Sequence, residues 1–316
     1  MESDPIVLLF FRGKTMLDIH WLKTFVMLAE LKHFGKAATA LHMTQPNVSL
    51  HLKQLEKKTH TKLIERSPFR LTQAGHRLLQ TSQKTLQALK VCQADINALN
   101  DLSQGTLTIA ASDIISRVLL IEPFQLFKLE YPNIDLALFN STSTLASSLV
   151  KSADADLGIV IAQKQSLPLH YTELQTVHWC ALGQDLSLLK ARPLSKLIDE
   201  VPTFILLGHD TRTRDLIDVA LPLLAFLDYR VMEVGSVDAQ IDWAEAGFGI
   251  AIVPDFSVHY KKNLSADILR LDEFPATSLG YIVRQNQILS KAVKHLLSLV
   301  KEKIASNKQK NKYSSS

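Results

Sequence analysis

The stretch TQPNVSLHLKQLEKKT, residues 44–59, decides the fold of the first part of the chain. Its apolar residues Val48, Leu52 and Leu55 are spaced by four and three, which is the pattern of an amphipathic helix with one buried edge. Thr44 is a residue type that caps helices, and Pro46 in the first turn costs no hydrogen bond. We therefore expect a helix over residues 45–59.

The opposite face of this helix is polar, and its side chains suit the major groove of DNA. Glutamine can pair with adenine, serine can reach a base or a phosphate, and lysine neutralises phosphate. A solvated amphipathic helix without a partner is the alternative, and the helix alone does not decide between the two interpretations. The face consists of Gln45, Pro46, Ser49, Leu50, Lys53 and Lys57.

Two helices before this stretch and a hairpin after it complete a recognisable domain. The helical spacing of apolar residues predicts helices over residues 19–31 and 36–41. The compact stretch 62–72, which contains Arg66 and Arg70, predicts a small basic hairpin. Three short helices followed by such a hairpin form the winged helix-turn-helix arrangement.

A long helix is predicted next, because Thr72 can cap a helix that continues to residue 102 without an interrupting proline. A helix of about 30 residues spans about 45 Å, which is longer than a small domain needs. We therefore favour a linker and dimerisation helix over a helix that packs only on its own domain. Its apolar stripe has the coiled-coil-like spacings of seven and three and consists of Leu79, Leu86, Leu89, Ile96 and Leu99.

After Gly105 the pattern changes to short apolar strands separated by helices. This alternation predicts an α/β fold with parallel sheets that helices cover on both faces. The end of the chain is polar from residue 308, and we expect a disordered tail over residues 305–316. The strands are expected at residues 106–111, 134–139, 156–161, 204–207 and 250–253.

Charge is distributed unevenly along the 316 residues, which together carry a net charge of +4. Residues 1–100 hold 14 Lys and Arg against 7 Asp and Glu, whereas the remaining residues hold 21 against 24. A basic part joined to an acidic part is typical of a DNA-binding domain fused to a domain with another task. No apolar run reaches the roughly 20 residues that cross a bilayer, so we expect no membrane partner.

Motifs of catalysis are missing from the sequence. We find no Gly-rich phosphate loop, no nucleophile elbow and no metal-ligand spacing, so we expect no catalytic residue, no metal and no cofactor. The two cysteines, Cys92 and Cys180, lie far apart, which is typical of a reducing compartment such as the cytoplasm. Trp179-Cys180 predicts the core of a strand, with a reactive thiol at Cys180 as the alternative.

The N-terminal stretch resembles the LysR-type transcriptional regulators closely, in order and register. The matching residues are Leu22, Phe25, Ala37, Ala38, Leu41, residues 44–49, Leu55, Glu56, Leu63, Arg66, Leu71, Thr72, Ala74 and Gly75. The resemblance implies that the polar face of the third helix reads DNA and that the wing addresses the DNA backbone. The implied contact residues are Gln45, Pro46, Ser49, Lys53, Arg66 and Arg70.

Three positions depart from the family pattern. Leu50 stands where a basic residue is frequent, which puts one DNA contact in doubt. Ile64 replaces a usual phenylalanine, which is a tolerable change in a core. His60 stands where glycine is common at the end of the third helix, and a residue other than glycine can adopt the left-handed conformation there at modest cost.

The resemblance continues more weakly over residues 105–304 and implies an effector-binding domain of two α/β subdomains like those of periplasmic binding proteins. It rests on residues 156–159 and on the glycine-rich segment 247–254. We place subdomain I at residues 106–175 plus 277–304 and subdomain II at 176–276. Before this domain we place the winged helix-turn-helix at 16–75 and the linker helix at 76–104. Residues 1–15 lie outside the family pattern and are either the artefact of a misplaced start or a real short arm.

Ligands of parallel α/β sheets collect beyond the carboxyl ends of the strands, next to helix N-termini that attract anions. Hydroxyl groups and Arg212 follow the predicted strands, so we expect a small carboxylate or another oxyanion as the effector. Plain helix caps are the alternative for each single residue. The candidate effector residues are Ser112, Ser141, Thr142, Ser143, Thr144, His209, Thr211 and Phe248, of which Ser112 and Ser143 match effector positions of the family.

These observations predict a bacterial, cytoplasmic transcription regulator. Its expected partners are an operator in double-stranded DNA, a small-molecule effector, a second copy of itself in a dimer or tetramer, and RNA polymerase. The competing hypothesis is a small-molecule-binding protein or enzyme whose N-terminal domain only mediates assembly. Salt dependence separates the two hypotheses, because a protein with several phosphate contacts loses DNA affinity steeply as salt rises.

Overall fold

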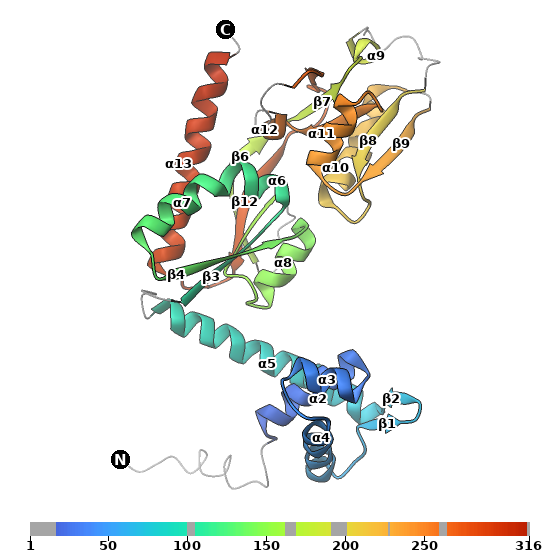
Figure 1. Cartoon of the computed structure of the whole chain (residues 1–316), viewed down its shortest axis with the longest axis vertical. Coiled ribbons are helices and arrows are strands. Elements are labelled where there is room, and N and C mark those ends of the chain that lie inside the picture. The colour runs from blue at the N-terminus through green and yellow to red at the C-terminus, as the bar shows by residue number, and fades with distance from the viewer. Residues whose placement is uncertain are drawn as a thin grey trace. The chain divides into compact units, whose positions relative to one another are not determined.

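The computed structural model describes residues 17–99, 105–161, 169–190, 201–226, 228–258 and 264–314. The chain divides into two compact units, Met1–Gln93 and Ala94–Ser316, and we describe each by itself (Figure 1). The segment 1–15, for which the sequence left two interpretations open, lies outside the described residues. None of the described helices is both long and apolar enough to cross a membrane.

The N-terminal unit is a winged helix-turn-helix, as predicted. Three helices, α2 (Ile19–Leu31), α3 (Phe34–Ala40) and α4 (Gln45–Thr59), precede an antiparallel hairpin of β1 (Ile64–Arg66) and β2 (Phe69–Leu71). The long helix α5 (Gln73–Leu99) follows. The helices pack on one apolar cluster, which is centred on Phe25, Leu28, Val48, Leu52 and Leu55.

The ends of these helices show which of the expected capping residues terminate or begin a helix in the structure. His60 adopts the left-handed conformation, with φ 52° and ψ 28°, and its N–H donates to Glu56 O, so α4 ends there without glycine. Thr72 caps α5 by accepting a 3.0 Å hydrogen bond from Gly75 N. Thr44 stands at the N-cap of α4, but its side chain makes no capping hydrogen bond, contrary to our expectation. Here Pro46 in the first turn already removes one of the backbone donors.

The C-terminal unit contains two five-stranded sheets, and we call the part around each sheet a subdomain. The first sheet has the order β4-β3-β5-β12-β6 and the second has the order β11-β7-β10-β8-β9. The strands of the first sheet are β3 (Gly105–Ala111), β4 (Ile134–Asn140), β5 (Leu157–Ile161), β6 (Leu169–Val177) and β12 (Thr277–Arg284). Those of the second are β7 (Trp179–Gly183), β8 (Thr203–Leu207), β9 (Arg230–Val234), β10 (Ile250–Pro254) and β11 (Asp267–Arg270).

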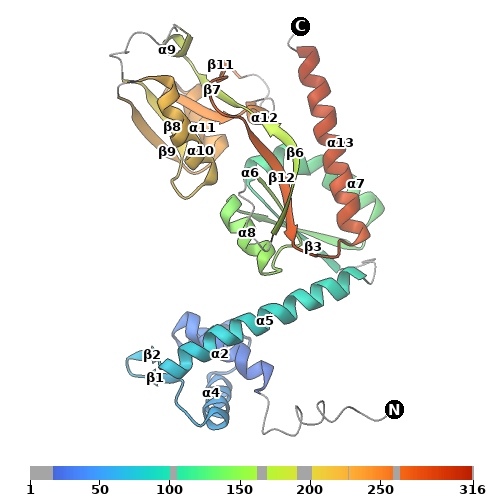
Figure 2. The same cartoon turned by 180° about the vertical axis from the view of Figure 1, so that it is seen from behind.

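Both sheets are mixed, whereas the alternation of strands and helices predicted parallel sheets. The pairs β3–β4, β3–β5, β8–β9 and β8–β10 are parallel as expected. The pairs β12–β5, β12–β6, β10–β7 and β11–β7 are antiparallel. In the first sheet the reason is that the chain crosses between the subdomains through β6 and β12, which lie side by side as an antiparallel pair (Figure 2).

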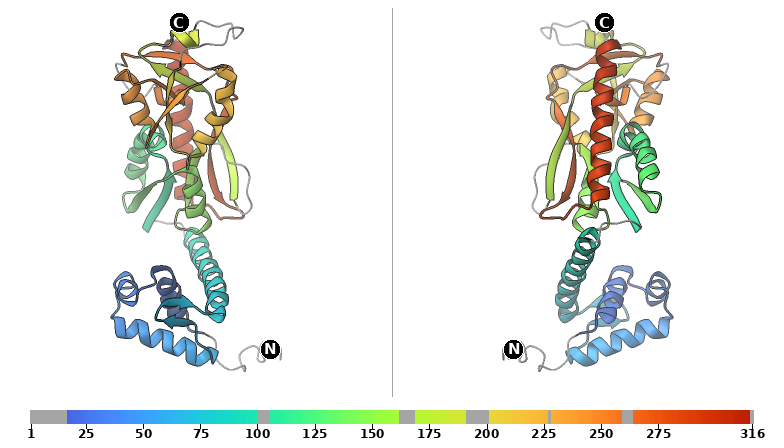
Figure 3. Two further views of the ribbon diagram at one scale, coloured as in Figure 1. Left: turned by 90° about the vertical axis from the view of Figure 1, so that its right-hand side faces the viewer. Right: turned by 90° about the vertical axis from the view of Figure 1, so that its left-hand side faces the viewer.

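Helices cover both faces of the first sheet. Helix α8 (Ser143–Lys151) packs Ala146 and Val150 on one face. Helices α7 (Ile121–Glu130) and α13 (Lys291–Ser314) pack Phe127, Leu296 and Val300 on the other, and α13 runs along the subdomain in Figure 3. Between β3 and α7 lie a short helix α6 (Asp113–Ile115) and a π-helical turn η1 (Ser116–Leu120).

The second sheet is covered in the same way. Helix α11 (Val237–Glu245) packs Val237, Ile241 and Ala244 on one face. The other face is covered by α9 (Ser187–Lys190), α10 (Arg212–Ala220) and the 3-10 turn η2 (Leu221–Leu224), and a short helix α12 (Asp255–Val258) follows β10. The buried Gln240 donates from Nε2 to Ile205 O at 2.7 Å and to Ile252 O at 3.1 Å, which ties α11 to β8 and β10.

The end of the chain differs from the expected disordered tail over 305–316, because α13 continues to Ser314. Ile304 is the last residue of α13 that is buried among the described side chains. Lysine, glutamine and alanine are good helix formers, and lysine near a helix C-terminus complements the helix dipole. Local propensity therefore extends the helix beyond the point where packing stops.

Candidate functional site

Helix α4 presents the predicted DNA face outward. Val48 and Leu55 are fully buried and Leu52 is nearly so, whereas Gln45, Pro46 and Lys53 are exposed. Ser49 is half-buried and Leu50 is 49% exposed. An exposed leucine beside serine and lysine is suited to contact an apolar group such as the thymine methyl. The polar side chains of this face are therefore available to a partner.

The wing holds its two arginines in different ways. The guanidinium of Arg66 lies over the ring of Phe34, with 5.1 Å between its central carbon and the ring centroid. Phe34 in turn makes an edge-on contact with Phe69 in β2 of the hairpin. Arg70 pairs in register with Glu65, and both are exposed. Arg66 is therefore positioned by α3 and β2 while its charge remains accessible.

Two contacts that the sequence did not predict fix α4 in place. The Thr24 hydroxyl donates to His20 O at 2.8 Å, so it accepts from His51 Nδ1, also at 2.8 Å. Glu56 accepts from Leu63 N at 2.9 Å and pairs with Lys62 Nζ at 3.1 Å. The first contact ties α4 to α2 and the second ties it to the wing. Together they connect α4 to its neighbours on both sides.

A cavity of about 140 Å³ lies in the C-terminal unit where strands of both sheets end. Its walls come from the turns after β3, β4, β8 and β9. The cavity approaches the size of an engineered cavity that binds benzene, about 150 Å³, so it suits a small molecule. Its lining consists of Ser112, Asp113, Ile114, Ile115, residues 140–143, Ile161, Leu207, residues 211–213 and residues 235–237.

Four helices begin at this cavity, and each has a hydroxyl residue at its N-cap: Ser112, Thr142, Thr211 and Ser236. Thr142 and Thr211 cap their own helices by accepting from Leu145 N and Arg214 N, so the plain capping role that we considered holds for both. Free backbone N–H groups and the helix dipole make such N-termini favourable to anions. The same lining also contains the charged side chains of Asp113 and Arg212.

Three serines of the cavity, Ser112, Ser141 and Ser143, make no capping hydrogen bond. The Ser141 side chain is only 7% exposed, and its hydroxyl finds no partner among the described residues. A buried hydroxyl without a partner costs free energy, which a ligand oxygen would recover. Ser143 lies beside them and donates to Ile161 O at 3.3 Å.

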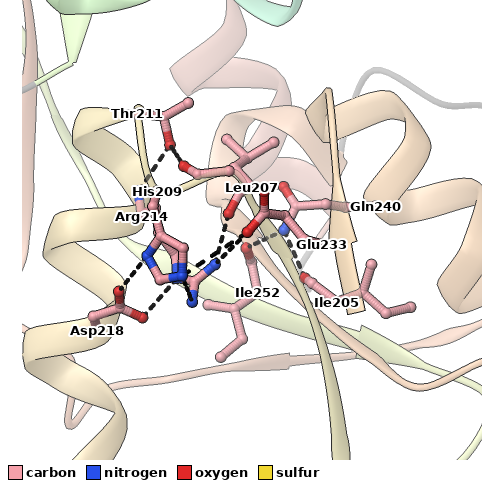
Figure 4. A network of polar contacts seen from close by, with 10 residues as sticks. Ile205, Leu207, His209, Thr211, Arg214, Asp218, Glu233, Gln240 and Ile252 are labelled. Carbon is pink, nitrogen blue, oxygen red and sulfur yellow. Dashed lines mark hydrogen bonds and ion pairs between the residues drawn. The ribbon is translucent and has the colours of Figure 1, made fainter. Parts of the chain in front are cut away.

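The loop after β8 owes its shape to a buried arginine that the sequence analysis missed (Figure 4). Arg214, 4% exposed, donates to Leu207 O at 2.9 Å and to Asp218 Oδ1 at 2.7 Å. It also lies 3.1 Å from His209 Nε2 and 3.6 Å from Glu233 Oε2. The network holds the residues that lead into Thr211 in place, because Arg214 contacts both Leu207 at the end of β8 and His209 in the turn. No local pattern marks this arginine, since its partners come from three elements.

The structure brings together five of the predicted effector residues: Ser112, Ser141, Thr142, Ser143 and Thr211. Thr144 lies one residue beyond the lining, and His209 points into the Arg214 network. Phe248 is 55% exposed and contacts Trp243 edge-on with ring centroids 4.6 Å apart, away from the lining. Arg212, which the sequence placed after β8, does line the cavity.

Neither metal binding nor thiol chemistry is suggested by the described residues. Among them, no group of three or more His, Cys, Asp and Glu is placed to hold a metal ion. Cys180 is buried in β7, and burial raises the pKa of its thiol to about 12. Since the thiolate is the reactive form, this favours the strand-core interpretation of Cys180 over a reactive thiol.

Comparison with known proteins assigns both units to known families. The family model described as "Bacterial regulatory helix-turn-helix protein, lysR family" matches residues 19–76, and the model "LysR substrate binding domain" matches residues 100–305. A "Probable RuBisCO transcriptional regulator" of Porphyra purpurea is 30% identical over 242 residues, which are 70% of this chain and 73% of that protein. The "Uncharacterized HTH-type transcriptional regulator YfeR" of Shigella flexneri is 25% identical over 240 residues, which are 73% of this chain and 76% of that protein.

Solved structures with similar folds extend over nearly the whole chain. Full-length OxyR C199D from Pseudomonas aeruginosa has a TM-score of 0.63 at 20% identity and covers 90% of this chain and 95% of its own. Full-length CbnR complexed with its target DNA has a TM-score of 0.59 at 17% identity and covers 90% and 99%. At such low identity these likenesses concern the fold alone.

Proposed function

The chain belongs to the LysR family of DNA-binding transcription regulators, and we propose that it reads a specific operator under the control of a small anionic effector. Membership of the family makes the chain a transcription regulator with an effector-binding domain and not an enzyme. We also propose which residues contact DNA, what kind of effector binds and how the chain associates with itself.

The DNA-reading surface is the exposed face of α4 together with the wing. Ser49 and Lys53 stand one helical turn apart on this face, where one can reach a base edge and the other a phosphate. The main support for this DNA-reading surface is that α4 has a buried edge, Val48 to Leu55, and an exposed polar face on the opposite side. The complete contact set is Gln45, Pro46, Ser49, Leu50, Lys53, Arg66 and Arg70.

The effector is a small carboxylate or a similar oxyanion held in the cavity of the C-terminal unit. Four helix N-termini around one cavity favour negative charge, and the partnerless Ser141 hydroxyl can donate to a ligand oxygen. Ser112 and Ser143 lie next to it on the same wall. Apolar neighbours such as Ile115 and Val237 leave room for a small hydrocarbon part of the ligand.

Self-association through α5 completes the proposal. Leu89 and Ile96 are 48% and 46% exposed on this helix, whereas Leu79 already packs against the N-terminal core. A second copy of α5 would remove these side chains from water, as in a coiled coil. The regulator then presents two copies of α4 to two half-sites in the cytoplasm, with RNA polymerase as a further partner.

Binding of the purified chain to the DNA upstream of its own gene tests the proposal. We expect specific retention in a gel shift that survives nonspecific competitor and weakens steeply from about 50 to 200 mM salt. Ser49→Ala and Lys53→Ala should weaken retention while the oligomeric state stays unchanged. Failure of the folded protein to retain any genomic fragment, with candidate carboxylates present, would support the competing small-molecule-binding protein.

A further inference from the structure

Arg117 connects the two subdomains beside the cavity. Its Nε lies 2.8 Å from Asp113 Oδ2 in its own subdomain, and its Nη1 lies 2.9 Å from Asp238 Oδ2 in the other. Asp113 lines the cavity, and Asp238 directly follows the lining residue Val237. One guanidinium therefore joins the two subdomains beside the cavity.

The backbone at Arg117 is unusual in a way that supports a functional role. Arg117 lies in η1, the π-helical turn that separates α6 from α7. Such turns carry one residue more than an α-helical turn, and they occur frequently at functional sites. Asp238 lies in the first turn of α11, where a carboxylate is favoured by the helix dipole. Both ends of the contact are therefore placed by helix geometry.

The ion pair between Arg117 and Asp238 is weak enough to form and break reversibly. The side chains of Arg117, Asp113 and Asp238 are 44%, 34% and 18% exposed, so water and salt screen the charges in part. Exposed ion pairs of this kind change an equilibrium by about two- to fivefold. That is enough to bias two arrangements of the subdomains, and too little to lock either of them.

We propose that the ion pair between Arg117 and Asp238 is a latch that holds the two subdomains together beside the cavity. The covalent connections, through β6 and β12, tie the subdomains by their backbone, whereas the latch ties them by charge. An anion that enters the cavity adds negative charge next to Asp113 and Asp238, and it therefore acts on the same guanidinium. This inference rests on the proposed function only in treating the cavity as a ligand site.

The two carboxylates that bind Arg117 provide a matched pair of variants. Asp238→Asn removes the contact between subdomains, and Asp113→Asn removes the contact inside one subdomain. Arg117→Gln removes both. If the latch acts between the subdomains, Asp238→Asn and Arg117→Gln change the distance between the subdomains in the same way. The double variant then changes it no further, and Asp113→Asn leaves it as in the unmodified chain.

Pulsed electron paramagnetic resonance on the full chain measures the distance between the subdomains without DNA or effector. Spin labels are attached to cysteines introduced by Ser148→Cys in α8 and Ala246→Cys after α11, in a Cys92→Ser background. Ser148 and Ala246 are both exposed. Cys180 stays unlabelled because it is buried. An excess of unlabelled chain restricts the signal to distances inside one chain, and circular dichroism checks that each variant is folded.

We expect a longer distance to appear in Arg117→Gln and in Asp238→Asn, with its population raised about two- to fivefold. Raising the salt from about 0.05 to 0.5 M should produce the same population in the unmodified chain and no further change in Arg117→Gln. Equal distance distributions in all variants would overturn the latch. So would an Asp113→Asn variant that opens as far as Asp238→Asn. Because neither DNA nor effector takes part, these outcomes leave the proposed function untouched.

Discussion

The guanidinium of Arg66 in the wing lies over the aromatic ring of Phe34 in α3, 5.1 Å from its centroid. This contact orients a cation that would otherwise move freely on an exposed hairpin. Phe34→Leu keeps an apolar side chain but removes the cation–π contact, which is worth about 0.5–1 kcal/mol at exposed sites. We expect DNA affinity to fall about two- to fivefold in fluorescence anisotropy at constant salt. In an Arg66→Ala background the same substitution should have no further effect, and an unchanged affinity in Phe34→Leu alone would show that the contact does not serve DNA binding.

Lys53 and Ser49 are expected to contribute to DNA binding in different ways. Lys53→Ala should weaken binding to all sequences and reduce the slope of log K against log salt by about 0.9, because one phosphate contact is lost. Ser49→Ala should weaken binding to the operator more than to unrelated DNA and leave the slope unchanged. Salt titrations on both DNAs measure this difference. A slope that both variants leave unchanged would place Lys53 away from the phosphates.

At Gly75, α5 lies close against the backbone of Leu63 at the start of the wing. A Cβ on Gly75 would lie 2.1 Å from Leu63 O, and backbone on both sides limits relaxation. We expect Gly75→Ala to lower the free energy of unfolding by about 1–3 kcal/mol, as overpacking does. Urea denaturation measures this change. Ala88→Gly, at an exposed position of the same helix, is the control and should cost only about 0.5–1 kcal/mol.

Substitution of Ser141 should weaken ligand binding without making the fold less stable. Its buried hydroxyl has no partner in the described part of the chain, so Ser141→Ala should leave the melting temperature without ligand unchanged or slightly raised. The same variant should lose most of the thermal stabilisation produced by small carboxylates, beginning with acetate. Thermal shift assays on both proteins test this. Equal stabilisation of Ser141→Ala and the unmodified chain would move the anion away from Ser141.

The two cysteines should differ sharply in reactivity. Burial raises the pKa of Cys180 from 9.0 to about 12, so its thiol stays protonated at pH 8, whereas Cys92 is exposed. We expect iodoacetamide to modify Cys92 alone in the folded chain, as mass spectrometry can show. Because unfolding restores the lower pKa, the Cys180 thiol also makes the fold less stable as the pH rises above about 9. Cys180→Ala should reduce this loss at alkaline pH.

Local patterns predicted the N-terminal unit well. The predicted bounds of α2 and α4 agree with the structure, because each helix carries its own apolar periodicity and its own end signals. The left-handed conformation of His60 was also expected, from the family resemblance, in which glycine is common at the end of this helix. Thr44 shows the limit of such signals. Its residue type indicates a cap, but the hydrogen bond depends on a rotamer that the sequence does not specify.

The sequence by itself determined the winged helix-turn-helix, the polar face of α4 and the hydroxyl residues that follow the strands, since these are features of neighbouring residues. Only the tertiary structure decided which of those hydroxyls meet in one cavity, with Ser141 inside it and Phe248 outside. It alone decided the partners of Arg214 and Arg117. The physical reason is that a buried or bridging charge is stabilised by groups far away in the chain, so its role depends on how the sheets and helices pack and not on its neighbours in sequence.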